Sequence, residues 1–191
     1  PMFDPFWARV NEAGITTVVH AGDSGYTTQG YAEDGFTSSG VAGGTGRYRP
    51  SIKGFNIERA AHDWLITMSL EKMYTRFGNL RIASVENGSD YLAPMFRKLR
   101  QQAMKSSHWF DEDPVALFRE HVWMNPFWED DVHEVVELMG ADHVIFGSDW
   151  PHIEGLPTPL DFLSEVEDLS DGDRRLVMRD NVRSLTELRP A

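Results

Sequence analysis

Residues 142–152 read DHVIFGSDWPH, and this stretch decides the fold class. Residues 142–147 form an apolar, β-branched run of the kind found in strands of a buried parallel sheet. Asp149 follows this run almost directly, and Trp150 and His152 come just after it. Ligands of α/β proteins bind at the carboxyl ends of parallel strands. The stretch therefore predicts a strand that delivers polar side chains to a site.

The same alternation of strands and helices runs through the rest of the chain. Strands are predicted over residues 15–20, 80–86, 121–124 and 142–147. Helices are predicted over residues 4–14, 56–77, 91–105, 129–139, 159–168 and 171–188. Strands separated by helices of ten or more residues form parallel sheets. We therefore expect an α/β fold in one domain over residues 1–191, either a small open sheet or half of a barrel.

The first helix and the first strand carry the most specific local predictions. Asp4 is expected as the N-cap of the first helix, with proline in its first turn and Gly14 closing it. The run ITTVVH over residues 15–20 predicts a strand that is buried on both faces. A glycine-rich loop insertion follows at about residues 22–54, on the ligand-binding side of such folds, and loops of this length are usually functional.

Composition excludes several classes of function. The 191 residues contain 18 Lys and Arg against 30 Asp and Glu, a net charge of −12, which argues against a nucleic-acid partner. The mean hydropathy is −0.40, and no apolar run reaches the roughly 18 to 20 residues of a membrane span. The chain has no cysteine, so disulfides and thiolate ligands are excluded, and a reducing cytoplasm is the expected location.

Three of the four predicted strands end in a side chain that can bind a metal: His20, Glu86 and Asp149. A barrel brings residues from the carboxyl ends of different strands around one pocket. Histidine and carboxylates without cysteine are the ligands of hydrolytic Zn, Mn or Fe sites. Each residue also has a simpler interpretation, since His20 could be a packed histidine, Glu86 could cap a turn and Asp149 could cap a helix. Their joint occurrence at strand ends favours a site.

Two further histidines are candidates for the same pocket. His152 lies three residues after Asp149 and could contact substrate. His62 lies early in the predicted helix over residues 56–77, where it could face the strand ends or only the solvent.

The most specific motif, VIFGSDWPH over residues 144–152, is followed about thirty residues later by RDNVRSL over 179–185. Together they resemble the C-terminal signature of the amidohydrolase-related family of metal-dependent TIM-barrel hydrolases and decarboxylases. The segment RFGNLRI over residues 76–82 is similar to the passage that precedes the sixth strand of that family. The resemblance covers essentially the whole chain. It implies the C-terminal half of a (β/α)8 barrel, strands five to eight.

By this resemblance, His20, Glu86 and Asp149 end strands five, six and eight. It implies that His20 and Asp149 are metal ligands and that Asp149 also handles the proton of the attacking water. Glu86 stands where the decarboxylase subgroup has a histidine that activates water, and it could serve as ligand or base. Trp150 and His152 are expected to line the substrate pocket.

The resemblance therefore implies one divalent metal, Zn in first place with Mn and Fe as alternatives. The expected reaction is hydrolysis of a small organic substrate, by attack of metal-activated water on a carbonyl-type carbon. Decarboxylation of a small carboxylic acid is the alternative, although a carboxylate at position 86 cannot donate a proton as an imidazolium does.

The two other metal ligands of the family form a His-x-His pair on its first strand, and this sequence contains no such pair. At 191 residues the chain is also shorter than the roughly 200 to 250 residues of a complete barrel. We therefore expect the C-terminal half of a longer protein, which alone binds metal weakly or not at all, because two ligands hold Zn poorly and catalytic Zn sites use three protein ligands. A binding module, or an inert fragment that pairs with a second copy or with the N-terminal half, stays open as an alternative.

Overall fold

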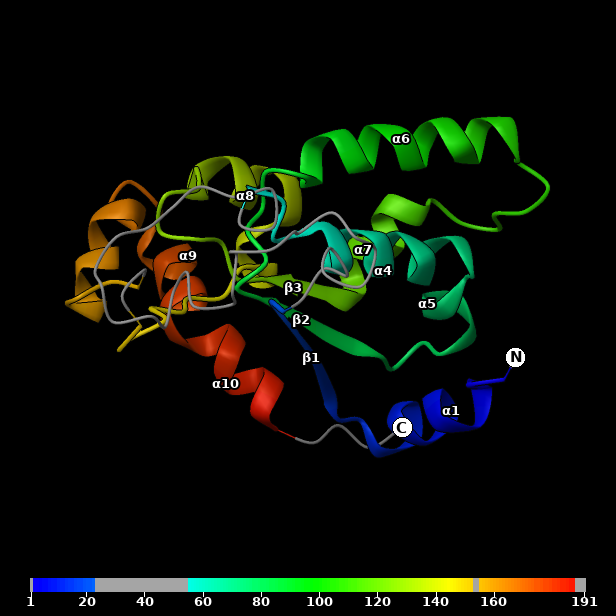
Figure 1. Cartoon of the computed structure of the whole chain (residues 1–191), viewed down its shortest axis with the longest axis horizontal. Coiled ribbons are helices and arrows are strands. Elements are labelled where there is room, and N and C mark those ends of the chain that lie inside the picture. Colours follow the sequence, from blue (N-terminus) through cyan, green and yellow to red (C-terminus); the bar gives the residue numbers. More distant parts are fainter. Residues whose placement is uncertain (1, 23–54, 153–154, 188–191) are drawn as a thin grey trace, which may run out of the picture.

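The computed structural model describes residues 2–22, 55–152 and 155–187, so most of the glycine-rich segment at about 22–54 lies outside the described residues. At its centre is a parallel sheet in the order β1 (Thr16–His20), β2 (Arg81–Val85) and β3 (Val122–Met124) (Figure 1). Helices separate each strand from the next in the chain. The predicted α/β class is therefore confirmed.

Four helices cover one face of this sheet: α4 (Arg59–Leu70), α6 (Leu92–Lys105), α7 (Pro114–His121) and α8 (Val132–Met139) (Figure 1). The main core lies between them and the sheet, and its fully buried members include Leu65, Ile82, Phe118, Met124 and Val144. Residues Ile82 and Met124 belong to strands, Val144 pairs with Met124 in a β-bridge, and Leu65 and Phe118 belong to the covering helices, so helix-facing positions of the sheet form this core. None of the described helices is long and apolar enough to cross a bilayer.

The fourth predicted strand, over residues 142–147, is reduced to one β-bridge between Met124 and Val144. A 3₁₀ turn, η1 (Ala141–His143), occupies the start of the expected strand. Ile145 N–H still donates to Met124 O (2.8 Å), but Phe146 N–H donates to Val177 O (3.0 Å) instead of to a strand. The prediction was too long because a ladder needs repeated pairing with a neighbour, which an apolar sequence run cannot reveal.

The prediction that the first strand is buried on both faces was wrong. β1 pairs only with β2, and Val18 at its centre is 58% exposed. Val18 belongs to the face of the sheet that the four helices do not cover. This face borders a hollow of about 380 Å³ with an apolar lining: Ile15, Val18, Ala83, Val85, Ile145, Val182 and Leu185. The sequence run was apolar enough for a buried strand, but one of its faces is open among the described residues.

The last described helix, α10 (Asn181–Thr186), is bonded through its C-terminal end to the first residues of β1 and β2. The buried guanidinium of Arg81 donates to the carbonyl oxygens of Ser184 (2.9 Å) and Glu187 (2.8 Å), and also to that of Gly14. Thr16 Oγ1 donates to Leu185 O (2.6 Å). A cation beside the carbonyl oxygens at the C-terminal end of a helix stabilises the helix, and these bonds fix α10 to the sheet.

Several helix bounds differ from the expectations. Helix α1 (Asp4–Ala13) ends at Gly14, whose φ of 58° is left-handed as predicted for a closing glycine, but Phe3 is its N-cap. The Asp4 carboxylate binds Arg76 instead of capping the helix. The predicted helix over residues 56–77 divides into α4 and α5 (Met73–Arg76), because Lys72 between them has a left-handed φ of 55°.

The C-terminal helical region is also less regular than predicted. The expected helix over residues 159–168 is the 3₁₀ helix η2 (Pro159–Val166). The expected helix over residues 171–188 consists of α9 (Asp171–Arg175), a π-helical turn η3 (Leu176–Asp180) and α10. Helix α7 was not predicted, although an Asp113 N-cap followed by proline is a usual start signal.

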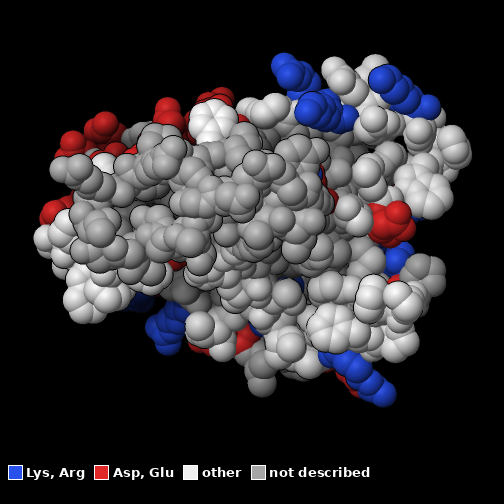
Figure 2. Space-filling view, in the orientation of Figure 1, with Lys and Arg blue, Asp and Glu red and all other residues white. Residues whose placement is uncertain are grey.

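Charge is distributed unevenly over this fold. Helix α6 carries Arg97, Lys98, Arg100 and Lys105 and no acidic residue. In Figure 2 these basic side chains gather over α6 at the upper right, whereas acidic side chains gather at the upper left. Although the chain has a net charge of −12, the end of the molecule that carries α6 is locally basic.

Candidate functional site

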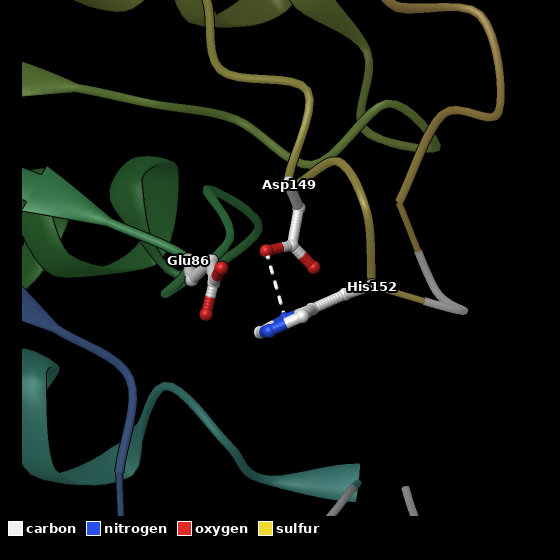
Figure 3. Close-up of side chains that lie close together, drawn as sticks. All are labelled: Glu86, Asp149 and His152. Carbon is white, nitrogen blue, oxygen red and sulfur yellow. Dashed lines mark ion pairs between the residues drawn. The ribbon is translucent and has the colours of Figure 1, made fainter. Parts of the chain in front are cut away.

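Three side chains that can bind a metal meet where the chain leaves the carboxyl ends of the strands: Glu86, Asp149 and His152 (Figure 3). Each offers one ligand atom, and these atoms all lie within 4.8 Å of one another. Glu86 follows β2, and Asp149 follows the segment that bridges β3 through Val144. Residues more than sixty positions apart in the sequence are thus gathered at one edge of the sheet.

Glu86 and Asp149 share an unusual backbone conformation. Their φ angles are 56° and 54°, left-handed values that aspartate tolerates but that are uncommon for glutamate. At Glu86 this conformation costs about 1 kcal/mol or more and persists where surrounding contacts hold it. Both acids therefore leave their strands through a sharp turn that surrounding contacts must hold in place.

His20, the last residue of β1, lies against Glu86. Its Nδ1 is 2.9 Å from Ala21 O, and because a carbonyl only accepts, Nδ1 carries a proton. Its Nε2 is 3.1 Å from Glu86 Oε2, within hydrogen-bond distance. The bond from Nδ1 fixes the ring with Nε2 directed toward Glu86, as in metal-binding histidines.

The electrostatic environment keeps a proton on Glu86. Burial, together with hydrogen bonding to Asp149 and repulsion from its charge, raises the pKa of the Glu86 carboxyl from 4.5 to about 7. His20 and His152 act in the opposite direction with smaller effect. Two neighbouring carboxyl groups that cannot both ionise freely are a common arrangement in sites that bind cations or move protons.

His152 reaches Asp149 through a tight turn over residues 149–152. Its backbone N–H donates to Asp149 O (2.8 Å), and its Nδ1 lies 3.1 Å from Asp149 Oδ1 (Figure 3). The next described residues pack back onto this turn, since Leu156 N–H donates to Ser148 O (2.9 Å). A Cβ on Gly155 would lie 2.7 Å from Ser148 O and 2.8 Å from Asp149 O. Gly155 thus packs closely against the turn that carries Asp149, and a side chain at this position would meet the backbone of that turn.

The donor set fits a divalent cation. Ligands at about 2.1 Å from a Zn or Mn ion lie roughly 3 to 4 Å from each other, so the observed limit of 4.8 Å requires only small side-chain movements. His20 is not part of this group of three, but its Nε2 lies beside Glu86, and a ligand role for it stays a prediction. Glu86 and Asp149 keep only 22% and 20% of their side-chain surface exposed, whereas His20 and His152 are more than half exposed. The carboxylates thus form the base of the site and the imidazoles its open side.

The remaining predicted pocket residues lie in different surroundings. Trp150 is in the same turn as Asp149, is 62% exposed, and its backbone N–H donates to Ser148 Oγ (3.3 Å). His62 lies half-buried in α4, and its ring packs against Tyr91 with 5.0 Å between centroids. Burial lowers the pKa of His62. Substrate roles for Trp150, His152 and His62 stay predictions.

Sequence reasoning missed the polar residues that hold the strand ends together. Asn87 is buried, and its Nδ2 donates to Val19 O (2.8 Å) and Val85 O (2.9 Å). The buried amide of Asn125 donates to Ile145 O (3.3 Å). Asn-Gly after a strand reads as an ordinary turn, so only the pairing of Asn87 with two strands reveals its role.

The fold and the site define this chain as an α/β protein with a candidate metal site at its strand ends. Comparison with known proteins identifies its family. A family model described as amidohydrolase matches residues 1–185. The chain therefore belongs to the amidohydrolase family, as the resemblance in its sequence implied.

Solved structures of several relatives share this fold. The amidohydrolase map2389c from Mycobacterium avium subsp. paratuberculosis K-10 is 37% identical, with a TM-score of 0.80 over 95% of this chain and 44% of its own. The 5-carboxyvanillate decarboxylase LigW from Sphingomonas paucimobilis is 15% identical, with a TM-score of 0.66 over 99% of this chain and 54% of its own. A dihydroxybenzoic acid decarboxylase from Polaromonas sp. JS666, solved with manganese and the inhibitor 2-nitroresorcinol, is 16% identical, with a TM-score of 0.67 over 95% of this chain and 52% of its own.

The chain thus spans about half the length of these solved relatives. Among curated proteins the comparison finds no match.

Proposed function

We propose that this chain supplies strands five to eight and most of the metal site of a metal-dependent amidohydrolase that hydrolyses a small organic substrate. The observation that carries the proposal is the convergence of Glu86, Asp149 and His152 within 4.8 Å, with His20 against Glu86. These residues come from the ends of successive parallel strands, as in sites of barrel enzymes. The sequential order of β1, β2 and β3, followed by the bridge to Val144, supports half of a (β/α)8 barrel.

In this proposal His20, Glu86 and Asp149 hold one divalent cation, with Zn first and Mn or Fe as alternatives. A cation held there would lower the pKa of water and polarise the substrate carbonyl. The manganese in the dihydroxybenzoic acid decarboxylase supports an ion of this class.

The side chains of this chain then handle the protons. Asp149 accepts the proton of the attacking water, because its Oδ1 lies 3.1 Å from His152 Nδ1 and the imidazole can stabilise the charge or take the proton onward. Glu86, which holds a proton near neutral pH, releases it when the cation binds. Trp150, together with His152 and His62, borders the substrate.

We favour hydrolysis over decarboxylation because of the side chain at position 86. Glu86 is a carboxyl group beside the carboxylate Asp149, and it can act as a ligand or base. A Glu86 that binds a cation is ionised and has no proton to give to a carbanion or an aromatic carbon, which an imidazolium could protonate. The decarboxylases among the structural relatives, at 15 to 16% identity, support the shared fold.

We further propose that another polypeptide covers the open face of the sheet. The hollow beside Val18, Ala83 and Ile145 is lined mainly by apolar side chains, and Val18 is 58% exposed at its border, so a covering polypeptide would bury apolar surface there. The N-terminal half of such a barrel is the first candidate and a second copy of the chain the next. A cytoplasmic location remains part of this proposal, supported by the cysteine-free composition.

Metal analysis of the purified chain and of a longer protein that contains it tests the proposal. We expect one Zn, Mn or Fe ion per longer protein, and weak binding by the 191 residues alone. Asp149→Asn and Glu86→Gln should each lower the metal content of the longer protein. Stoichiometric, tightly held metal in the 191-residue chain would contradict the need for further ligands, and metal content that neither substitution changes would contradict the site.

A further inference from the structure

We propose that Asp130 is a positioning residue that holds the turn carrying Glu86 in its metal-binding geometry. The inference rests on the proposed metal site and assigns a role to a residue outside it. Asp130 lies in the loop between β3 and α8, whereas Glu86 follows β2, so the interaction links two strand-end loops.

Asp130 uses a single carboxylate oxygen to bridge the two loops. Its Oδ2 accepts a hydrogen bond from Ser89 Oγ (2.8 Å) and one from Phe127 N–H (2.9 Å). The Asp130 N–H in turn donates to Phe127 O (3.2 Å), which closes the turn over residues 127–130. Bonds to a charged acceptor are stronger than neutral ones, so the two loops are held together by one anion.

Steric contact reinforces this bridge. Gly88, between Glu86 and Ser89, has a left-handed φ of 64°. A Cβ at this position would lie 2.8 Å from Phe127 Cε2 and 3.8 Å from Asp130 Oδ2. Residue 88 is therefore pressed against the same turn that Asp130 closes, and only glycine fits there.

Glu86 is thus held from both sides. On the β1 side, the Asn87 amide donates to the carbonyls of Val19 and Val85. On the β3 side, Ser89 is bound to Asp130, three residues from Glu86. A left-handed residue between two fixed points cannot relax to an extended or helical backbone, so its carboxyl group stays directed toward Asp149.

Asp130 differs from an ordinary turn residue in its burial and in its contacts. Burial raises its pKa, and the hydrogen bonds from Ser89 and Phe127 oppose that effect. Asp131, the next residue, has a purely local contact, because its Oδ1 accepts from the N–H groups of His133 and Glu134 at the start of α8. Asp130 therefore bridges two loops, whereas Asp131 only caps a helix.

Asp130→Ala and Asp131→Ala form a matched pair for the test, with amide exchange measured in the 191-residue chain and Mn²⁺ affinity in the longer protein that contains it. Amide hydrogen exchange reports the order of each loop, since Leu92 N–H bonds Ser89 O and Phe127 N–H bonds Asp130. Mn²⁺ affinity, measured by water-proton relaxation, reports the site. Ser89→Ala removes one of the two bonds, and Asp130→Asn keeps an oxygen that can accept both.

We expect Asp130→Ala to speed exchange at Leu92 and Phe127 and to weaken Mn²⁺ binding by about tenfold, as loss of a group that orients a ligand does. Asp131→Ala should speed exchange only at His133 and Glu134 and leave Mn²⁺ affinity within about twofold of wild type. Ser89→Ala should lie between, and Asp130→Asn should restore most of the affinity. If Asp130→Ala does not fold, these last two variants decide the question.

Unchanged exchange at Leu92 in Asp130→Ala would overturn the bridge, and faster exchange with unchanged Mn²⁺ affinity would overturn its role at the site. If the longer protein binds no Mn²⁺, the proposed metal function fails, while the exchange data still decide whether Asp130 orders the turn.

Discussion

The proton on Glu86 gives the chain a pH-dependent stability that Glu86→Gln should remove. The folded carboxyl has a pKa of about 7, against 4.5 for an unperturbed glutamic acid. Between these values the folded state holds a proton that the unfolded chain has lost. The free energy of unfolding must then fall as pH rises through this window, because stability decreases wherever the folded state binds more protons.

The size of the effect follows from the same two values. A gap from 4.5 to about 7 corresponds to about 3 kcal/mol at 1.36 kcal/mol per pKa unit. Water reaches the site beside the exposed rings of His20 and His152, so screening reduces this to about 1 to 2 kcal/mol. The loss should begin above pH 4.5 and be complete slightly above pH 7.

Urea unfolding without metal at pH 5, 6, 7 and 8 measures the effect. The wild-type chain should lose about 1 to 2 kcal/mol relative to Glu86→Gln over this range. Glu129→Gln, the same change at an exposed acid, provides the control and should follow the wild-type curve. Parallel curves for wild type and Glu86→Gln would refute the reasoning, since Glu86 would then ionise alike in both states.

Three other substitutions test separate parts of the structure. Asp149→Asn in the longer protein should retain the fold and lower kcat by about 10² to 10⁴, and an unchanged kcat would remove Asp149 from the mechanism. Gly155→Ala should destabilise the chain by about 1 to 3 kcal/mol in calorimetry, because its methyl group meets the backbone of Ser148 and Asp149. Arg81→Met should cost about 2 to 4 kcal/mol in urea unfolding, since buried carbonyls lose a charged donor, and a loss below about 0.5 kcal/mol would show that α10 is held by other contacts.

The sequence predicted well those elements whose packing follows from their own pattern. β2 and α6 lie within a residue or two of their expected bounds, since α6 has a buried apolar face at helical spacing and β2 is almost entirely buried. The prediction failed where a neighbour decides the outcome. Residues 142–147 have strand composition but pair at Val144 alone, and β1 has the composition of a buried strand but one open face.

The candidate site shows the same division. His20, Glu86 and Asp149 could be selected because each follows a predicted strand, and the chemistry of their side chains is visible in the sequence. Two features depend on backbone geometry: the contact of His20 with Glu86, and the turn that brings His152 to Asp149. This geometry includes left-handed φ angles that no sequence pattern predicts. Asp130 was missed because a buried acid that joins two loops has the same local sequence as a solvent-exposed turn.

The bonds of Arg81 to α10 also bear on the order in which the chain can fold. Its carbonyl partners at Ser184 and Glu187 are synthesised about a hundred residues after it, so the ribosome has nearly finished the segment before the base of the sheet can close. Contacts of such sequence separation are slow to form. We therefore expect the amino ends of β1 and β2 to stay incompletely packed until α10 has been synthesised, a stage at which exposed apolar surface favours aggregation.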